Sequence, residues 1–420
     1  MKTAFAASAA LLLASCVAIN GEGTPAGAPG DRAWAPVGDK TGSITDKAQL
    51  EALSVRYPDS ASVRLRLLSA QLKDRDEEGA ITSLSWLYAR NYVFGNGGKA
   101  QIVKALAGAD TARVEALLRA PADVIARSTL LRTIPAEAGL IESVWVDPQY
   151  GRLLATSVTG RAVWGDTPSG AMKGIAQDGA GNLSGIAYDE TNDRIWVASG
   201  NIDGSDNAER TFSGLIALTA LGAAPMRAAA PDGANISDIA VAQNGAVYAS
   251  DPLAGGIYVL RPGEERMAVM VAPGTFRSPQ GLATSEAGDA LYVSDYRYGL
   301  ARVDLATGRV DLLAGSAGVT VPLDGIDGLW RYGNTLIAMQ NGSSPMRILA
   351  LDLDPTGRRI LRSRTIEQAH PEWSEPLGGS IHRGHLVYVA DGQWDVYDQH
   401  GQVREGKQPR ATHVRSVPLD

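Results

Sequence analysis

Hydrophobic and polar residues follow two different rhythms along the chain. Over residues 45–125, apolar side chains recur every three to four positions, as at Leu65, Leu68 and Leu72, which predicts helices. Over residues 126–415, this period gives way to short alternating segments separated by Gly, Asp, Asn and Pro, which is typical of strands joined by tight turns. The pattern predicts a small α-helical domain followed by a mainly β domain.

The helical segment contains two helices with a polar break between them. In YPDSASVRLRLLSAQLKDRDEEGAITSLSWLYARNY, the first helix begins near Asp59, and KDRDEEG interrupts the pattern before the second. The pair resembles one tetratricopeptide repeat, which spans about 34 residues, although the Trp-Leu-Gly-Tyr signature is absent. A plain helical hairpin packed on the next domain explains the same pattern, so both interpretations stay open.

Six similar units make up the β part. They begin with IESVW, LSGIA, ISDIA, PQGLA, IDGLW and LGGSI, and their third letters are Ser143, Gly185, Asp238, Gly281, Gly328 and Gly379. A β-sandwich would not give so regular a repeat, whereas four-stranded blades repeat about every 40 to 50 residues. Stacking such sheets around an axis buries both faces of each sheet. The sequence therefore predicts a six-bladed β-propeller, and we expect the strand-like tail HVRSVPL to pair with the first unit.

The first 19 residues have the features of an export signal. MKTAFAASAALLLASC carries one lysine, an apolar stretch too short to span a membrane, and small residues before Cys16. LLASC resembles the bacterial lipobox, in which cleavage falls just before a cysteine whose thiol is diacylated. Cys16 is the single cysteine of the chain, which favours a lipid anchor over a disulfide, while simple cleavage after Ala18 is the alternative. We expect an exported envelope lipoprotein facing the periplasm, with Gly- and Pro-rich residues 20–44 as a flexible tether.

Composition narrows the range of partners. The chain has 420 residues, of which 45% are hydrophobic and 20% charged, as in ordinary globular proteins. Its net charge of −7 gives no basic surface for nucleic acid, so we expect membrane contact through the lipid anchor alone. P-loop, dinucleotide-binding and G-x-S-x-G motifs are absent, so no nucleotide or organic cofactor is expected.

Polar side chains occupy the second position of five of the six units, where an inner propeller strand begins at one end of the central channel. These positions bring together two carboxylates, one amide and two hydroxyls, and no hydrophobic side chain. Oxygen ligands of this kind suit Ca²⁺ or Mg²⁺ better than zinc. The six residues are Glu142, Ser184, Ser237, Gln280, Asp327 and Gly378.

With IESVW, PQGL and IDGLW in these places, residues 130–400 resemble the regucalcin and gluconolactonase family, and more broadly the NHL-type propellers that bind partners. In that family a Glu of the first blade, an Asn of a PNG stretch and an Asp of a DG stretch hold a divalent metal. The resemblance implies Glu142, Gln280 and Asp327 as ligands of a divalent cation (Ca²⁺, Mg²⁺ or Mn²⁺). Gln280 departs from the family pattern by one methylene.

The resemblance also implies roles around the metal. Asp327 would be the catalytic residue that activates water, and Ser184, Asn235 and Ser237 would contact the substrate. Family enzymes have an Arg and an Asn before the third inner strand, and this chain lacks that Arg. The missing Arg favours a propeller that binds an unknown ligand or envelope protein. The alternative is a metal-dependent lactonase or esterase.

Other polar residues have structural explanations. A second ring, which follows the second strand of four units, is expected to cap turns through side-chain bonds to backbone N–H groups. His382 and His385 flank a predicted hairpin turn and are expected at the surface. The ring consists of Asp251, Asp295, Asn341 and Asp391.

Overall fold

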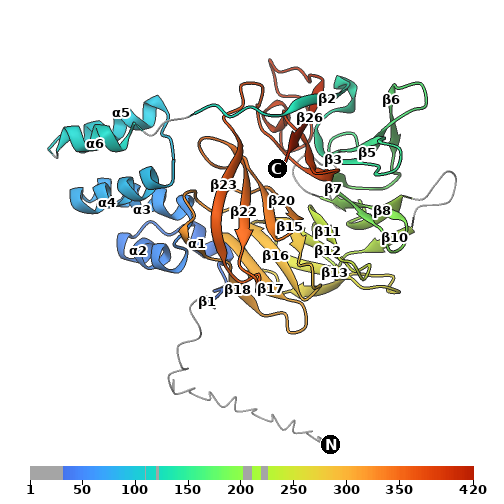
Figure 1. Cartoon of the computed structure of the whole chain (residues 1–420), viewed down its shortest axis with the longest axis horizontal. Coiled ribbons are helices and arrows are strands. Elements are labelled where there is room, and N and C mark those ends of the chain that lie inside the picture. The colour runs from blue at the N-terminus through green and yellow to red at the C-terminus, as the bar shows by residue number, and fades with distance from the viewer. Residues whose placement is uncertain (1–31, 109, 120–122, 202–210, 219–225) are drawn as a thin grey trace, which may run out of the picture.

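The protein is mainly β, with many small sheets and few helices. The computed structural model describes residues 32–108, 110–119, 123–201, 211–218 and 226–420. Within these ranges the strands form six sheets of four or five strands, antiparallel except where the short β19 joins β23 (Figure 1). The predicted mainly-β fold class is confirmed.

Each sheet is built largely from strands that follow one another in the chain. From the innermost strand outward the sheets are β3 (Ile141–Val146), β4 (Leu153–Ser157), β5 (Ala162–Asp166), β6 (Met172–Ala176); β7 (Asn182–Asp189), β8 (Arg194–Gly200), β9 (Gly214–Leu218), β10 (Met226–Ala229); β11 (Ile239–Val241), β12 (Val247–Asp251), β13 (Gly256–Leu260), β14 (Ala268–Val271); β15 (Pro279–Thr284), β16 (Ala290–Asp295), β17 (Gly299–Asp304), β18 (Val310–Leu312), β1 (Arg32–Ala33); β20 (Gly328–Tyr332), β21 (Thr335–Gln340), β22 (Arg347–Leu353), β23 (Ile360–Gln368), β19 (Gly315–Gly318); and β24 (Gly379–His382), β25 (His385–Val389), β26 (Thr412–Pro418), β2 (Thr129–Ile134).

The innermost strands contact one another in a closed ring, in the order β3, β7, β11, β15, β20, β24 and back to β3. Glycine permits the close approach. A Cβ on Gly281 would lie 2.4 Å from the backbone nitrogen of Leu329 in β20, and one on Gly185 would lie 2.9 Å from that of Ile239 in β11. At these two positions the third-letter glycine thus lies against the backbone of the next inner strand.

Alternating side chains of the middle strands pack against the two neighbouring sheets. On β16, Leu291 and Val293 belong to a buried cluster with Ile257 of β13. Tyr292, which lies between them in sequence, belongs to a different cluster with Leu336 of β21. Successive side chains of a middle strand thus pack against opposite neighbouring sheets, which explains the two-residue period in the sequence.

The beginning and the end of the β part meet in the last sheet. β26 pairs with β25, and β2 pairs with the other edge of β26 (Figure 1). The sequence analysis expected the tail to pair with the first unit. The tail instead joins the sheet of the last unit. That sheet already has four strands of its own, whereas the last unit supplies only β24 and β25 before the tail.

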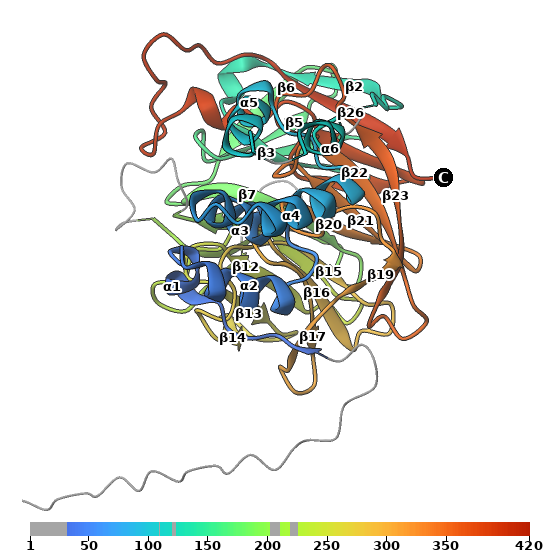
Figure 2. The ribbon, with the colours of Figure 1, turned by 90° about the vertical axis from the view of Figure 1, so that its left-hand side faces the viewer.

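Six α-helices precede β2 in the part of the chain that the structure describes, and they gather on one side of the sheets (Figures 1 and 2). Ser60 caps the N-terminus of α3 with its side chain, and Asp46, Asp76 and Asp110 cap α2, α4 and α6 in the same way. α3 and α4 correspond to the predicted pair, and its likeness to a tetratricopeptide repeat stays a prediction. The helices are α1 (Gly38–Gly42), α2 (Lys47–Arg56), α3 (Ala61–Lys73), α4 (Glu77–Ala89), α5 (Asn96–Ala105) and α6 (Thr111–Leu117).

The segment before α2 packs on the sheets, which differs from the flexible tether expected over residues 20–44. β1 pairs with β18, and the buried ring of Trp34 packs against Tyr57 and Phe276. The indole N–H of Trp34 also donates to the carbonyl oxygen of Thr275 (2.9 Å). The contacts of Trp34 and the pairing of β1 thus hold this Gly- and Pro-rich segment against the sheets.

Residues 1–31, which include the expected signal and Cys16, lie outside the described residues. Across the rest of the chain that the structure describes, no helix is both long and apolar enough to cross a membrane.

The helices and sheets share a polar joint. Asp324, which precedes β20, accepts the backbone N–H of Ala61 (2.8 Å) and of Ser62 (2.7 Å) at the start of α3. The hydroxyl of Ser60 donates to the carbonyl oxygen of Arg297 (2.7 Å). Apolar residues of α2 and α3, such as Leu50, complete the joint within the same buried cluster as β16.

Candidate functional site

A pocket of about 570 Å³ is enclosed by the six inner strands. All six second-position residues line it, and we call them the floor: Glu142, Ser184, Ser237, Gln280, Asp327 and Gly378. The other lining residues follow these along each inner strand and into the turn after it. The pocket therefore extends from the floor toward the C-terminal ends of the inner strands.

Glu142 and Asp327 are the two carboxylates that the sequence placed on the floor, and the structure brings them to one pocket. Desolvation, together with the negative charges of Asp327, Glu375 and Asp238, raises the pKa of Glu142 well above its usual range. Desolvation and the charge of Glu375 likewise raise the pKa of Asp327. Protein surroundings and like charges thus both disfavour the ionised forms.

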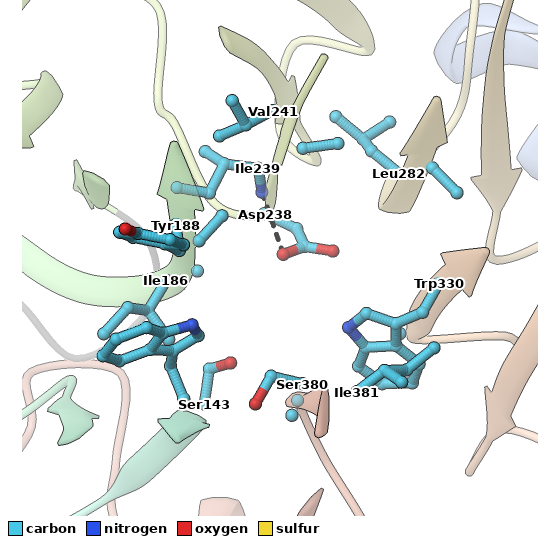
Figure 3. Close-up of a pocket in the computed structure, with 18 of the residues that line it drawn as sticks. Ser143, Ile186, Tyr188, Asp238, Ile239, Val241, Leu282, Trp330, Ser380 and Ile381 are labelled. Atoms are coloured by element: carbon cyan, nitrogen blue, oxygen red, sulfur yellow. Dashed lines mark hydrogen bonds between the residues drawn. The ribbon is translucent and has the colours of Figure 1, made fainter. Parts of the chain in front are cut away.

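Asp238 adds a third carboxylate to the pocket lining (Figure 3). One of its oxygens accepts the backbone N–H of Ile239 (2.9 Å), while desolvation raises its pKa to about 7. Among the described residues, neither Asp238 nor the two floor carboxylates form an ion pair with lysine or arginine. The acidic end of the pocket therefore has no protein cation to balance its charge.

Gln280 supplies the amide of the floor. Its side-chain nitrogen donates to the hydroxyl of Ser278 (3.2 Å), which leaves the amide oxygen as the acceptor that a ligand can use. β15 and β16 change register between Pro279 and Leu282, so the backbone is irregular where Gln280 sits. Gln280 therefore has a longer side chain than the Asn of the family pattern, and it projects from an irregular part of β15.

Trp394 and Asn341 contact the floor without lining the pocket, and Tyr296 bonds Asn341 behind them; we call these three side chains the cap. The indole N–H of Trp394 donates to Oε2 of Glu142 (3.2 Å). The amide of Asn341 donates to Oδ2 of Asp327 (3.0 Å) and accepts the hydroxyl of Tyr296 (2.9 Å). The cap therefore orients both floor carboxylates from the side opposite to the pocket.

The floor offers the carboxylate oxygens of Glu142 and Asp327 and the amide oxygen of Gln280 to one pocket. The described residues contain no group of three or more His, Cys, Asp or Glu side chains arranged to hold a metal. A cation there would also offset the charge repulsion that raises the carboxyl pKa values. Carboxylate and amide oxygens are the ligands that Ca²⁺ and Mg²⁺ accept.

The residues expected to contact substrate fall in different places. Ser184 and Ser237 line the pocket, but the Ser184 hydroxyl donates to the backbone oxygen of Ser237 (2.6 Å) and so ties two inner strands together. Asn235 does not line the pocket. Its side-chain oxygen accepts the backbone N–H of Asn201 (3.2 Å) instead.

The second ring has the expected capping role in part. Asp251 and Asp295 each accept backbone N–H groups of the turn that follows them. Asn341 instead holds Asp327, which the sequence analysis did not foresee. Of the two histidines, His385 is exposed, whereas His382 lines the outer part of the pocket.

The sequence analysis missed Glu375 and Trp394 and did not give Asp238 or Asn341 a role at the floor. Asp238 stands where four other units have glycine and one has serine, and only its acidity among small residues could have marked it. Glu375 and Trp394 lie in irregular segments, where no periodic signal exists, and Asn341 is part of an ordinary turn sequence.

Comparisons with known proteins complete the description of the site. No protein-family model and no curated protein matches the sequence. Similar solved structures include a gluconolactonase from Xanthomonas campestris (TM-score 0.47, 16% identity, covering 71% of this chain and 97% of that one). They also include regucalcin, a calcium-binding protein from Agrobacterium tumefaciens (TM-score 0.46, 15% identity, 70% and 95% covered). A third is the PQQ-bound aldose sugar dehydrogenase of Streptomyces coelicolor (TM-score 0.44, 15% identity, 70% and 99% covered). Proteins of the family that the sequence resembles are thus among the structural neighbours, and at these scores nothing about activity follows from them.

Proposed function

We propose that the six sheets form a six-bladed β-propeller that works as a divalent-metal-dependent lactonase or esterase. The observation that carries this proposal is the convergence of Glu142, Gln280 and Asp327 in one pocket whose acidic end has no protein cation. The sequence alone favoured a binding protein, because the Arg of the family is missing. The pocket brings together three acidic side chains, and burial raises the pKa of each of them. Carboxyl groups perturbed in this way favour hydrolysis instead.

The floor residues would share the chemistry as follows. When bound by Glu142, Gln280 and Asp327, a Ca²⁺, Mg²⁺ or Mn²⁺ ion supplies a Lewis acid that polarises the ester carbonyl. A carboxylate accepts a proton from the attacking water, and the resemblance assigns this step to Asp327. Asp238 is a second proton acceptor, since a pKa of about 7 suits general-base work at neutral pH.

The reaction is an ordinary hydrolysis. The water oxygen bonds to the carbonyl carbon, the ring carbon–oxygen bond breaks, and the ring oxygen leaves with a proton. One lactone and one water give one hydroxy acid. The cap positions the two floor carboxylates through Trp394 and Asn341 while this happens.

A calorimetric titration of the protein with Ca²⁺, Mg²⁺ and Mn²⁺ tests the metal site. We expect saturable binding of one ion, lost in Glu142→Gln and Asp327→Asn and retained in the exposed-site control Asp232→Asn. A screen of lactones and aryl esters in the presence of the bound ion then tests hydrolysis. Equal binding in all four proteins, or no metal-dependent turnover of any substrate, would refute the proposal.

A second candidate function is a binding propeller for a ligand or an envelope protein. It is favoured by the cap, because Trp394 and Asn341 satisfy oxygens of both floor carboxylates without any metal. The helices α2 to α6, as the small helical domain, would add a contact surface. Recovery of one envelope protein with the wild type, in the absence of metal binding, would support it.

For the location we propose an exported lipoprotein anchored through Cys16 and facing the periplasm. The support is the LLASC sequence and the single cysteine of the chain. Membrane fractionation of the wild type and of Cys16→Ala tests it. An unchanged membrane fraction in the variant would contradict the anchor.

A further inference from the structure

The wall of the pocket between the floor and the outer end carries large apolar side chains beside the hydroxyls of Ser143 and Ser380. Each of the six inner strands contributes a large apolar or aromatic side chain, and those of five strands surround the hollow in Figure 3. Several are only half-buried, so part of their surface remains open to the pocket. We call them the belt: Ile186, Tyr188, Val241, Leu282, Trp330 and Ile381.

The belt is poorly suited to a sugar lactone. Each sugar hydroxyl that enters an apolar surrounding needs a new hydrogen-bond partner, and losing water without one is costly. The belt offers few such partners, because the Tyr188 hydroxyl already donates to Asp193 (2.8 Å). No arginine or lysine lines the floor to hold a sugar-acid carboxylate either.

An alkyl or aryl chain fits the same wall well. From Asp238 to Ala242 an inner strand advances four residues, or about 13 Å at the usual strand rise. Three single bonds of an extended chain span about 3.5 Å, so this depth holds a lactone ring with about six further carbons. The volume of about 570 Å³ lies within the usual range for small-molecule sites.

Polar groups stand at both ends of the belt. Asp238 and the floor lie at one end, and Arg331, His382 and Arg383 line the other. The Ser380 hydroxyl, which also lines the pocket, has no hydrogen-bond partner within the described residues. A ligand with a polar head at the floor and an apolar chain leading outward matches this order.

We propose that the substrate is a lactone or ester carrying an alkyl or aryl chain, which enters head first from the C-terminal ends of the inner strands. Its carbonyl reaches the floor and its chain lies along the belt. This inference rests on the proposed hydrolase for the chemistry, although the belt would bind such a chain in any case. The head reacts by the hydrolysis described above, with water as the sole co-reactant.

A chain-length series measures the contribution of the belt. With the metal-loaded protein, kcat/KM is determined for δ-valerolactone, δ-octanolactone, δ-decanolactone and glucono-δ-lactone. Burying one methylene corresponds to about a fourfold gain, so kcat/KM should rise about fourfold per added methylene until the chain fills the pocket. Glucono-δ-lactone should be the poorest substrate.

A binding measurement separates the belt from catalysis. The ketone 3-pentylcyclohexanone has the shape of δ-decanolactone, with CH₂ in place of the ring oxygen and therefore no ester bond, and its binding to the metal-free protein is followed by calorimetry. Ile381→Ser, on β24, should weaken ketone binding tenfold or more and lower kcat/KM for δ-decanolactone similarly. Its effect on δ-valerolactone, which has no chain to lie along the belt, should be the smaller of the two. The matched control is Ile175→Ser, whose side chain lies 64% exposed on β6 away from the pocket.

Val241→Ser, on another strand of the belt, keeps the test decisive if Ile381→Ser does not fold. Ketone binding that both variants weaken supports the inference, even if no lactone is turned over, in which case the hydrolase proposal alone fails. Metal-dependent turnover of glucono-δ-lactone without ketone binding overturns the inference and leaves the hydrolase standing. If the protein neither binds the ketone nor turns over any lactone, both the inference and the hydrolase proposal are overturned.

Discussion

The acidic end of the pocket should make the metal-free protein less stable as the pH rises from 5 to 8. Asp238 is the cleanest group on which to test this, because desolvation raises its pKa to about 7 from an ordinary value of 3.8. A folded-state pKa above the unfolded one means that protonation favours the folded protein. The stabilisation is complete below about pH 4 and is lost as the pH passes through 7.

The magnitude follows from the difference between the folded and unfolded pKa values of Asp238. Each pH unit between the two pKa values changes the free energy of unfolding by about 1.4 kcal/mol for one group. Between pH 5 and pH 7 Asp238 therefore accounts for a loss of up to about 2.7 kcal/mol. Glu142 and Asp327, whose pKa values are also raised, add to the loss in the same direction.

The assay is urea unfolding of the metal-free protein at pH 5 and pH 8, for the wild type and Asp238→Asn. The variant should show a smaller pH dependence, by about 2 to 3 kcal/mol, and should be the more stable protein at pH 8. Asp232→Asn, at an exposed site, is the matched control and should behave as the wild type does. The same pH dependence in Asp238→Asn and wild type would refute the reasoning.

Three further changes test the cap, the joint and the ring. Trp394→Phe removes the hydrogen bond to Glu142, so the pKa of Glu142 should rise further and the pH midpoint of Ca²⁺ binding, measured by calorimetry, should move upward. An unchanged midpoint would count against the cap. Asp324→Ala removes two bonds to the start of α3 and should lower the free energy of unfolding in urea by about 1 to 2 kcal/mol. No loss would mean that the joint is held by apolar contacts alone. Gly281→Ala forces a Cβ against the next inner strand and should cost about 3 kcal/mol, whereas Gly97→Ala, in open space on α5, should be neutral or gain up to about 1 kcal/mol. Equal stabilities of the two glycine variants would refute the close-approach argument.

Much of the ring and the floor follows from the repeat in the sequence. An inner strand that lies against its neighbour needs a small residue where the backbones meet, and Gly185 and Gly281 meet that need. At these two positions the glycine marks the register of the inner strand. The alignment of the six units extends that register to the others, and it is this alignment that assigned Glu142 and Asp327 to one pocket.

The features that the sequence did not reveal depend on contacts between distant segments. Trp394 is 252 positions away from Glu142, to which it donates, and no local pattern encodes that bond. The docking of Trp34 depends on the shape of a surface built by β14 to β18, so composition alone suggested a tether. The pairing of the tail strand also depends on distant segments. The sheet of the first unit already has four strands, whereas the last unit supplies only two before the tail, and this difference appears only when all six sheets are compared.

Gln280 offers a test in which stability and metal affinity should respond with opposite signs. Gln280→Glu places another carboxylate on the floor, so at pH 8 the metal-free protein should unfold at lower urea than the wild type. The added charge should also tighten Ca²⁺ binding, because the number of charged ligands sets Ca²⁺ affinity. At a free Ca²⁺ concentration of about 100 times the dissociation constant, binding returns about 2.7 kcal/mol of stability.

The matched control for this test is Gln243→Glu, which adds the same charge at the outer end of the pocket. If Gln280 is a ligand, only Gln280→Glu should gain Ca²⁺ affinity, and saturating Ca²⁺ should reverse its loss of stability. A purely structural Gln280 would give a loss in stability without any gain in affinity. Equal Ca²⁺ affinities in the two variants would therefore remove Gln280 from the metal site, and with it the donor set on which the hydrolase proposal depends.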